Sequence, residues 1–217
     1  MYSKILRFIF FCILLFCFWY SFDITRFKDS VFQKRIENRT VFSVDSFDSL
    51  PTKEITIQQA IDLGIQQAKE YDKNPLLINM ASVDDGKISG LDGKKANWNG
   101  MFSLPNAKYR MATEIKNGKL KKYIILDTSS DIPFKRSDIT INSNDIVNLA
   151  VKRFALRPSF KKPPFKLGYH FQILRDDEQR PFFIIEGQTK SGKYMEIYYD
   201  PSAGEYLGKG VQENDNN

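Results

Sequence analysis

The sequence predicts an α+β protein: an N-terminal membrane helix followed by two tandem modules, each with one helix packed on a curved antiparallel sheet. An uncharged apolar run fills residues 8–22. An amphipathic helical pattern occurs twice, and each copy precedes apolar strands that polar turns separate. The predicted boundaries are an anchor or uncleaved signal at 1–22, a linker at 23–54, modules at 55–127 and 139–210, a second linker at 128–138 and a disordered tail at 211–217.

The apolar run from Phe8 to Phe22 lies at the short end of the roughly 17–25 residues that a membrane-spanning helix needs. A cleaved signal peptide has small residues before its cleavage site, whereas residues 16–20 are bulky or aromatic. The pattern therefore favours an uncleaved anchor, with a cleaved signal as the alternative. Cys12 and Cys17 both lie in this run, so the predicted modules contain no cysteine.

The flanking charges do not agree on the orientation of this anchor. Lys4 and Arg7 precede the run, but more basic residues follow it, and the positive-inside rule taken literally would keep the modules inside. A short N-terminal tail followed by an apolar run is typical of an export signal, and long domains cross the membrane largely regardless of charge. We therefore expect a membrane-anchored protein with its modules on the extracytoplasmic side.

Helix and turn signals define the first module. Thr56 and Gln59 fit a capping box at the start of an amphipathic helix that ends before Pro75. Four runs of strand length follow, and Asn117-Gly118 between the last two is a strong hairpin signal. The module is one helix followed by an antiparallel sheet.

The same order of signals returns after residue 138. Asn142 or Ser143 can cap a second helix about 86 residues after the first. The strands that follow include a hairpin at Lys190–Lys193, which we match to the hairpin at Lys116–Lys119. Helix and hairpin together indicate an internal duplication.

The end of the second module resembles the PepSY family of extracytoplasmic domains. That family typically ends on a strand, an Asp, a short turn, a Gly, a charged residue and an apolar one; Asp200, Gly204, Glu205 and Leu207 fit, while Ala203 stands where Thr is usual. The resemblance covers residues 139–208 and, more loosely, 55–127. It implies a cystatin-like α+β fold, in some members as part of a peptidase pro-segment that inhibits or chaperones the enzyme, and it brings no catalytic residues.

Signals for catalysis, metals and cofactors are weak. His170 is the one histidine of the chain and lies in an expected strand, so we interpret it as structural or surface-exposed. No phosphate-binding glycine loop is present, and the aspartates near residues 84–92 match no calcium loop. We expect no catalytic, cofactor-binding or metal-binding residues.

Two groups of residues are candidates for binding. Arg157, Lys161, Lys162 and Lys166 lie in a stretch without acidic residues and can bind an anionic lipid, a wall polymer or an acidic protein, or can simply be solvated. Tyr194 and Tyr198 alternate with Met195, Ile197 and Tyr199, so they fall on the other face of their strand. They either bind a ligand or cover neighbouring strands.

Composition leaves the function open. Of 217 residues, 27% are charged and 42% hydrophobic, which is ordinary for a globular protein, and the net charge of +6 is moderate. We expect a non-enzymatic binding or regulatory protein that modulates a peptidase or an envelope complex. It would be attached to the membrane through its N-terminal helix and would have a protein partner, not a nucleic acid. The alternatives are a structural spacer, a module that binds anionic polymer or lipid, and an unrecognised hydrolase.

Overall fold

The computed structural model describes residues 41–43, 53–127, 130–160 and 167–212, and the predicted anchor at 1–22 lies outside these ranges. Two α-helices, one 3₁₀ helix and nine strands occur in the described residues. In chain order they are β1 (Val41–Ser43), α2 (Ile57–Ala68), β2 (Leu76–Ser82), β3 (Trp98–Leu104), β4 (Tyr109–Lys116), β5 (Lys119–Asp127), η1 (Arg136–Asp138), α3 (Ser143–Phe154), β6 (His170–Arg175), β7 (Pro181–Gln188), β8 (Tyr194–Tyr199) and β9 (Tyr206–Val211).

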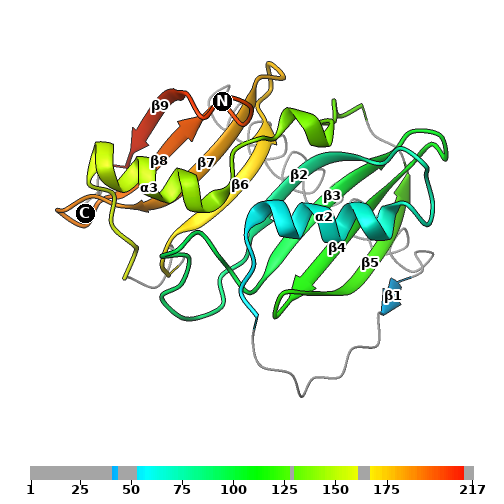
Figure 1. The fold of residues 1–217 in the computed structure, drawn as a ribbon, viewed down its shortest axis with the longest axis horizontal. Coiled ribbons are helices and arrows are strands. Elements are labelled where there is room, and N and C mark those ends of the chain that lie inside the picture. Colours follow the sequence, from blue (N-terminus) through cyan, green and yellow to red (C-terminus); the bar gives the residue numbers. More distant parts are fainter. Residues whose placement is uncertain (1–40, 44–52, 128–129, 161–166, 213–217) are drawn as a thin grey trace, which may run out of the picture. The chain divides into compact units, whose positions relative to one another are not determined.

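All nine strands belong to one antiparallel sheet in the order β1-β5-β4-β3-β2-β6-β7-β8-β9. Both α-helices lie on the same face of this sheet, α2 over β2 to β4 and α3 over the strands that follow it (Figure 1). The core fills the layer between helices and sheet, because alternate strand residues point into it. We call the other side of the sheet the far face.

The predicted fold class is wrong in two respects. The two helix-and-sheet units are not separate modules, because β2 pairs with β6 in the middle of the sheet, where Met80 lies opposite Ile173. This pairing satisfies backbone groups that two isolated sheets would leave on open edges. Within the described residues, no helix combines the length and apolarity needed to cross a membrane. The expected attachment to the membrane through an N-terminal helix is therefore not supported by the described residues.

The first helix forms as its sequence predicts. The Thr56 side chain accepts a hydrogen bond from the Gln59 backbone and the Gln59 side chain accepts one from the Thr56 backbone, which confirms the capping box. Gly64 faces the sheet, where a Cβ atom would lie 2.1 Å from the ring of Phe102. The glycine therefore lets α2 approach the sheet closely. The buried stripe consists of Ile57, Ala60, Ile61, Gly64 and Ala68.

The two halves of the sheet repeat one another. Each half is a helix followed by four strands, α2 with β2 to β5 and α3 with β6 to β9, and Ile57 and Ser143, which begin the helices, are 86 residues apart. The predicted match between the two hairpins is wrong by one strand. The turn at 190–193 joins β7 to β8 and corresponds to the turn between β3 and β4, whereas Asn117-Gly118 joins β4 to β5. Polar turns resemble one another whichever strands they join.

One strand lies inside the predicted linker. β1 pairs antiparallel with β5, and Val41, Phe42 and Ser43 lie opposite Ile124, Tyr123 and Lys122. Three residues are too few to show a strand period in the sequence. β1 covers the outer edge of the first half.

The motif that resembles PepSY domains is the turn between β8 and β9. The Asp200 carboxylate accepts hydrogen bonds from the backbone of Ser202 and Ala203, at 2.8 and 2.7 Å. Gly204 has φ +69°, and the Pro201 carbonyl accepts a hydrogen bond from the backbone of Thr140. Local turn chemistry and docking of the turn before α3 thus account for these residue types.

The helix N-termini meet at the joint between the halves. The Ile57 backbone N–H donates to the Ser143 hydroxyl at 3.1 Å, and that hydroxyl donates to the Gly93 carbonyl at 2.5 Å. The Gln58 side chain donates to the Thr140 carbonyl at 2.9 Å. Donors that a helix leaves unpaired in its first turn are thus bonded across the joint.

Asp72, which follows α2, should make stability depend on acid pH. Its side chain is 4% exposed and accepts hydrogen bonds from Asn74 and from the backbone and side chain of Asn106. Burial raises the pKa of Asp72, but these hydrogen bonds outweigh it and the net pKa is lowered. The stabilisation is therefore present above the unfolded-state pKa and is lost as the pH falls through the folded-state pKa.

We expect Asp72→Asn to lower the free energy of unfolding by about 1–3 kcal/mol at pH 7. The difference from wild type should be smaller at pH 3, because below about pH 4 the carboxyl takes up a proton in the unfolded state before it does so in the folded state. Urea unfolding at both pH values measures it. Asp62→Asn is the control, since Asp62 is exposed and pairs with Arg136 at the surface. An equal difference at both pH values would contradict the assignment.

Candidate ligand-binding site

The far face of the second half carries aromatic side chains. Met195, Ile197 and Tyr199 are buried toward the helix, whereas Tyr194 and Tyr198 are half-buried on the far face. This alternation confirms that the two groups of side chains lie on opposite faces of β8. Tyr198 lies opposite Ile184 of β7 and opposite Gly208 of β9. The far face is therefore lined by rings at this end of the sheet.

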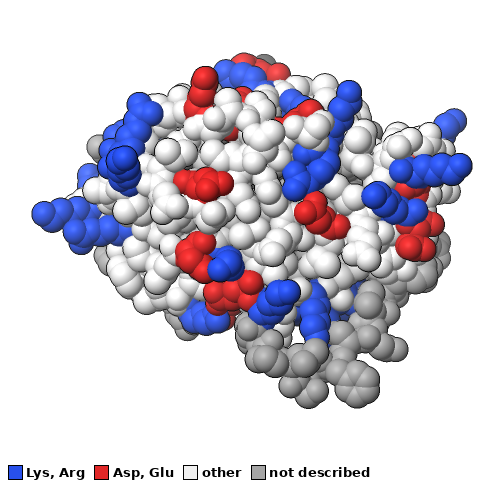
Figure 2. All heavy atoms as spheres, viewed as in Figure 1, with Lys and Arg blue, Asp and Glu red and all other residues white. Residues whose placement is uncertain are grey.

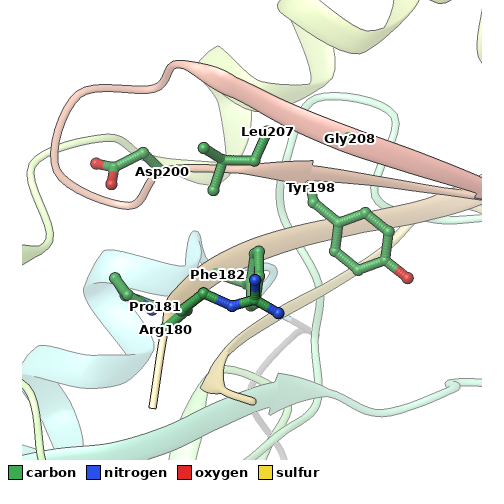
Figure 3. Close-up of a pocket in the computed structure, with 7 residues that line it drawn as sticks. All are labelled: Arg180, Pro181, Phe182, Tyr198, Asp200, Leu207 and Gly208. Atoms are coloured by element: carbon green, nitrogen blue, oxygen red, sulfur yellow. The ribbon is translucent and has the colours of Figure 1, made fainter. Parts of the chain in front are cut away.

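A hollow of about 520 Å³ lies on this face (Figure 3). The rings of Phe182 and Tyr198 meet edge to face in its wall, with centroids 5.6 Å apart. The Arg180 guanidinium stands 5.9 Å from the centroid of the Phe182 ring. The wall thus combines apolar surface with the cation of Arg180 and the carboxylate of Asp200, and such a mixture is found in sites that bind organic ligands or protein side chains. The lining residues are Arg180, Pro181, Phe182, Tyr198, Asp200, Leu207 and Gly208.

A bulge and a glycine create this hollow. The register of β8 and β9 shifts between Tyr198 and Tyr199: Tyr199 lies opposite Tyr206, while Tyr198 lies opposite Gly208. Leu207 is the extra residue, 49% exposed, and lines the hollow. A Cβ atom on Gly208 would have no atom within 4 Å. The space beside the Tyr198 ring is therefore open because residue 208 has no side chain.

Hydrogen bonds hold the two tyrosines in place. Tyr194 and Tyr198 both donate their hydroxyl protons to the Glu196 carboxylate, at 2.7 and 2.5 Å. Burial, followed by the hydrogen bond to Glu196, raises the pKa of Tyr198 to about 12. Burial and the charge of Glu186 raise the pKa of Tyr194. Both phenols are neutral at physiological pH, so they offer rings and hydroxyl acceptors to a ligand rather than a nucleophile.

Arg180 is positioned by acidic residues of the turn between β6 and β7. Its guanidinium lies 2.6 Å from Asp176 and 3.3 Å from Glu178, and the Asp176 carboxylate also accepts from the Arg180 backbone. These contacts are at the surface, so they orient the side chain more than they stabilise the fold. The place of this turn beside the hollow was not predicted from the sequence.

The predicted basic cluster is only partly placed. Arg157 pairs its backbone with Gln188, donating and accepting hydrogen bonds of 2.9 and 2.8 Å. Lys161, Lys162 and Lys166 lie outside the described residues. Whether these four residues form a site is therefore not tested, and their binding role stays a prediction.

A buried polar cluster surrounds Lys95, which the sequence analysis did not single out. The ammonium group, fully buried, donates to the Ser89 hydroxyl at 2.6 Å and lies 3.6 Å from the Asp85 carboxylate and 3.3 Å from Nε2 of His170. Burial lowers the pKa of Lys95, against the raising effect of Asp85. His170 is 1% exposed and also contacts the Ser82 hydroxyl at 3.1 Å. The histidine is therefore not surface-exposed, and its burial among polar partners favours the structural interpretation.

No group of three or more His, Cys, Asp or Glu side chains suited to a metal ion occurs in the part of the chain that the structure describes.

Comparisons with known proteins give little further information. No family model and no curated protein matches the chain. A solved structure from Clostridium difficile 630, described as that of a "putative lipoprotein", matches with 12% identity and a TM-score of 0.46, over 76% of this chain and 97% of its own. A similarity at this level carries no argument about fold or function. The resemblance to PepSY domains finds no support in these comparisons and stays a prediction.

Proposed function

We propose that the protein is a non-enzymatic binding protein that holds a segment of a partner protein in the hollow beside Tyr198. The observation that carries the proposal is the hollow itself, walled by Phe182, Tyr198 and Leu207 and left open by Gly208. Aromatic rings fixed by neighbouring contacts supply apolar contact area at low entropic cost. Arg180 at the rim supplies a charged group for orientation.

The side chains around the hollow favour binding over catalysis. The tyrosine hydroxyls donate to Glu196, and the Asp200 carboxylate accepts from the turn between β8 and β9. The Lys95 and His170 cluster, which has the residue types of a catalytic site, is closed to solvent. These groups therefore support structure rather than proton transfer to a substrate.

The location and the regulatory role of the protein are proposed from the sequence alone. An extracytoplasmic location rests on the uncharged apolar run of residues 8–22. Control of a peptidase rests on the PepSY resemblance alone.

Filling the hollow should abolish ligand binding without unfolding the protein. A leucine at position 208 would meet no atom at its Cβ and would add bulk to the hollow that Gly208 lines. We expect Gly208→Leu to weaken binding at least 10-fold and to change the free energy of unfolding by less than about 1 kcal/mol. Gly208→Ala should have an intermediate effect on binding.

The test uses a random library of linear 12-residue peptides displayed on phage and selected on the full-length protein. Selected peptides are then titrated by fluorescence polarisation against wild type, Gly208→Leu and the control Val151→Leu, which adds bulk at an exposed position of α3. Loss of binding in Gly208→Leu alone would support the proposal. Equal binding to all three proteins, or a selection that yields no peptide, would overturn it, and the second result would favour a structural spacer.

A further inference from the structure

We propose that β9 is the docking edge for an extended segment of the partner protein, which adds to the sheet as a further antiparallel strand. The segment would direct an acidic side chain toward Lys209 on the helix side and an apolar side chain toward the hollow on the far face. This inference rests on the proposed function and names how the same site is occupied.

The other end of the sheet already accepts such a strand. β5 is the last strand of the first half, and its outer edge is covered by the three residues of β1. β9 holds the equivalent position in the second half and, among the described residues, pairs only with β8. Figure 1 shows β1 beside β5 at one end of the sheet and β9 at the other. The repeated architecture therefore presents two equivalent edges, of which the described residues cover one in part.

The backbone of β9 is oriented for this pairing. The Gln212 N–H donates to the Tyr194 carbonyl across the β8 edge at 3.1 Å. Backbone groups alternate in direction along a strand, so the N–H and C=O groups of Lys209 and Val211 point away from β8. Both residues are exposed, Val211 by 40%. An added strand would satisfy these groups, as strand addition does at other sheet edges.

Charge and shape on the two faces of β9 specify the chemistry of the partner. On the helix side, the Lys209 ammonium lies 5.5 Å from the centroid of the Phe154 ring, and the Arg153 guanidinium lies 4.5 Å from that of Tyr206. Figure 2 shows Lys and Arg side chains at the end of this face where α3 ends. On the far face, Gly208 lines the hollow without a side chain, and a Cβ atom there would meet no atom within 4 Å. Alternation along a strand therefore calls for acidic and apolar residues in turn.

A second copy of the chain fits this edge less well than a partner of that composition. Lys209 lies near the middle of β9, so antiparallel pairing of two β9 strands about this position would bring two ammonium groups opposite each other. Like charges directly opposite across a strand pair are destabilising, and a lysine on an edge strand disfavours self-association. Opposite an acidic residue of a partner strand, the same lysine would stabilise the pairing, because the two charges attract.

A matched pair of variants separates the contribution of the backbone N–H of residue 209 to peptide binding from that of its ammonium group. Lys209→Ala removes the ammonium group and keeps the outward N–H, whereas Lys209→Pro removes both. The pairing with β8 should survive the proline, because the N–H that it removes points away from β8. The probe is a hexapeptide of alternating glutamate and valine with blocked ends, titrated against the full-length protein. We expect about 3-fold weaker binding to Lys209→Ala and at least 10-fold weaker binding to Lys209→Pro.

Two modified peptides keep the test valid if Lys209→Pro proves unstable in thermal unfolding. A version N-methylated at alternate residues cannot pair along its methylated edge, and an alternating lysine and valine version reverses the charge. Because the peptide can pair through either edge, both methylation registers are made. We expect at least one methylated register to bind at least 10-fold more weakly than the parent peptide, and the lysine version to bind more weakly than the glutamate version.

The outcomes separate this inference from the proposed function. The reference is the affinity of the unmodified glutamate peptide for the wild-type protein. Strand addition is overturned if Lys209→Pro binds this peptide with the same affinity and wild type binds both methylated peptides with the same affinity. This holds even if Gly208→Leu abolishes binding. If library peptides depend on Gly208 but the glutamate peptide does not bind, the partner chemistry is wrong and the hollow remains the site. A wild-type dimer in sedimentation that Lys209→Pro dissociates would make a second copy the occupant and would overturn the proposal.

Discussion

Replacing Lys95 with alanine is expected to lower the free energy of unfolding by about 3–5 kcal/mol, because it leaves the buried Asp85 carboxylate without its cation. The side chains of Lys95 and Asp85 are 0% and 5% exposed, and one oxygen of Asp85 has no hydrogen-bond partner in the structure. Removing the ammonium group also leaves the Ser89 hydroxyl and His170 with one contact fewer. Urea unfolding at pH 7 measures the loss.

The neighbouring Lys94 supplies the control. Lys94 pairs with Asp92 at the surface, where its side chain is 44% exposed, so Lys94→Ala should leave stability unchanged. A double variant, Lys95→Met with Asp85→Leu, removes both charges together. It should be less destabilised than the sum of the two single variants, because neither charge is left alone in the core. If Lys94→Ala and Lys95→Ala behave alike, the cluster does not stabilise the fold.

Gly93→Ala should be the second most damaging change, since it separates the loop before β3 from the start of α3. Gly93 has φ +80°, and a Cβ atom there would lie 2.2 Å from the backbone nitrogen of Asn144. The backbone strain alone costs about 1–2 kcal/mol, and the overlap with backbone atoms requires the joint to open. We expect a loss of about 3 kcal/mol or more in the free energy of unfolding.

Gly86→Ala isolates the strain from the overlap. Gly86 has φ +74°, but a Cβ atom there would meet nothing within 4 Å. It should therefore lose only the strain contribution, about 1–2 kcal/mol. Thermal unfolding of both variants measures the two losses of stability. Equal losses would show that the joint accommodates a methyl group at residue 93 without further cost.

Local signals were enough to predict the helices and hairpins. The capping box of Thr56 and Gln59 and the turn at Asn117-Gly118, where both residues have positive φ, are fixed by neighbours in the sequence. The pairing of β2 with β6 was not predicted, because it joins strands that a helix and several turns separate and leaves no local pattern. The same reason explains why two separate modules were expected.

The candidate site was predicted only as a strand face. Alternation along β8 identified Tyr194 and Tyr198, but the hollow depends on a bulge that brings Leu207 to the wall and sets Gly208 opposite Tyr198. Nothing in the sequence near Gly208 distinguishes it from a turn glycine. Lys95 is likewise one of two adjacent lysines in a polar loop, and its burial follows from packing against His170, 75 residues later.

The covering of β5 by β1 limits how the protein can associate. A sheet with two open edges can accept a neighbour at each end and so propagate into a fibre of linked sheets. In the described part of this chain, β1 already pairs with residues 122–124 of β5, so the edge at β9 is the more open of the two. A molecule that offers one such edge binds one partner strand and does not extend into a fibre, because growth needs a second edge on every copy.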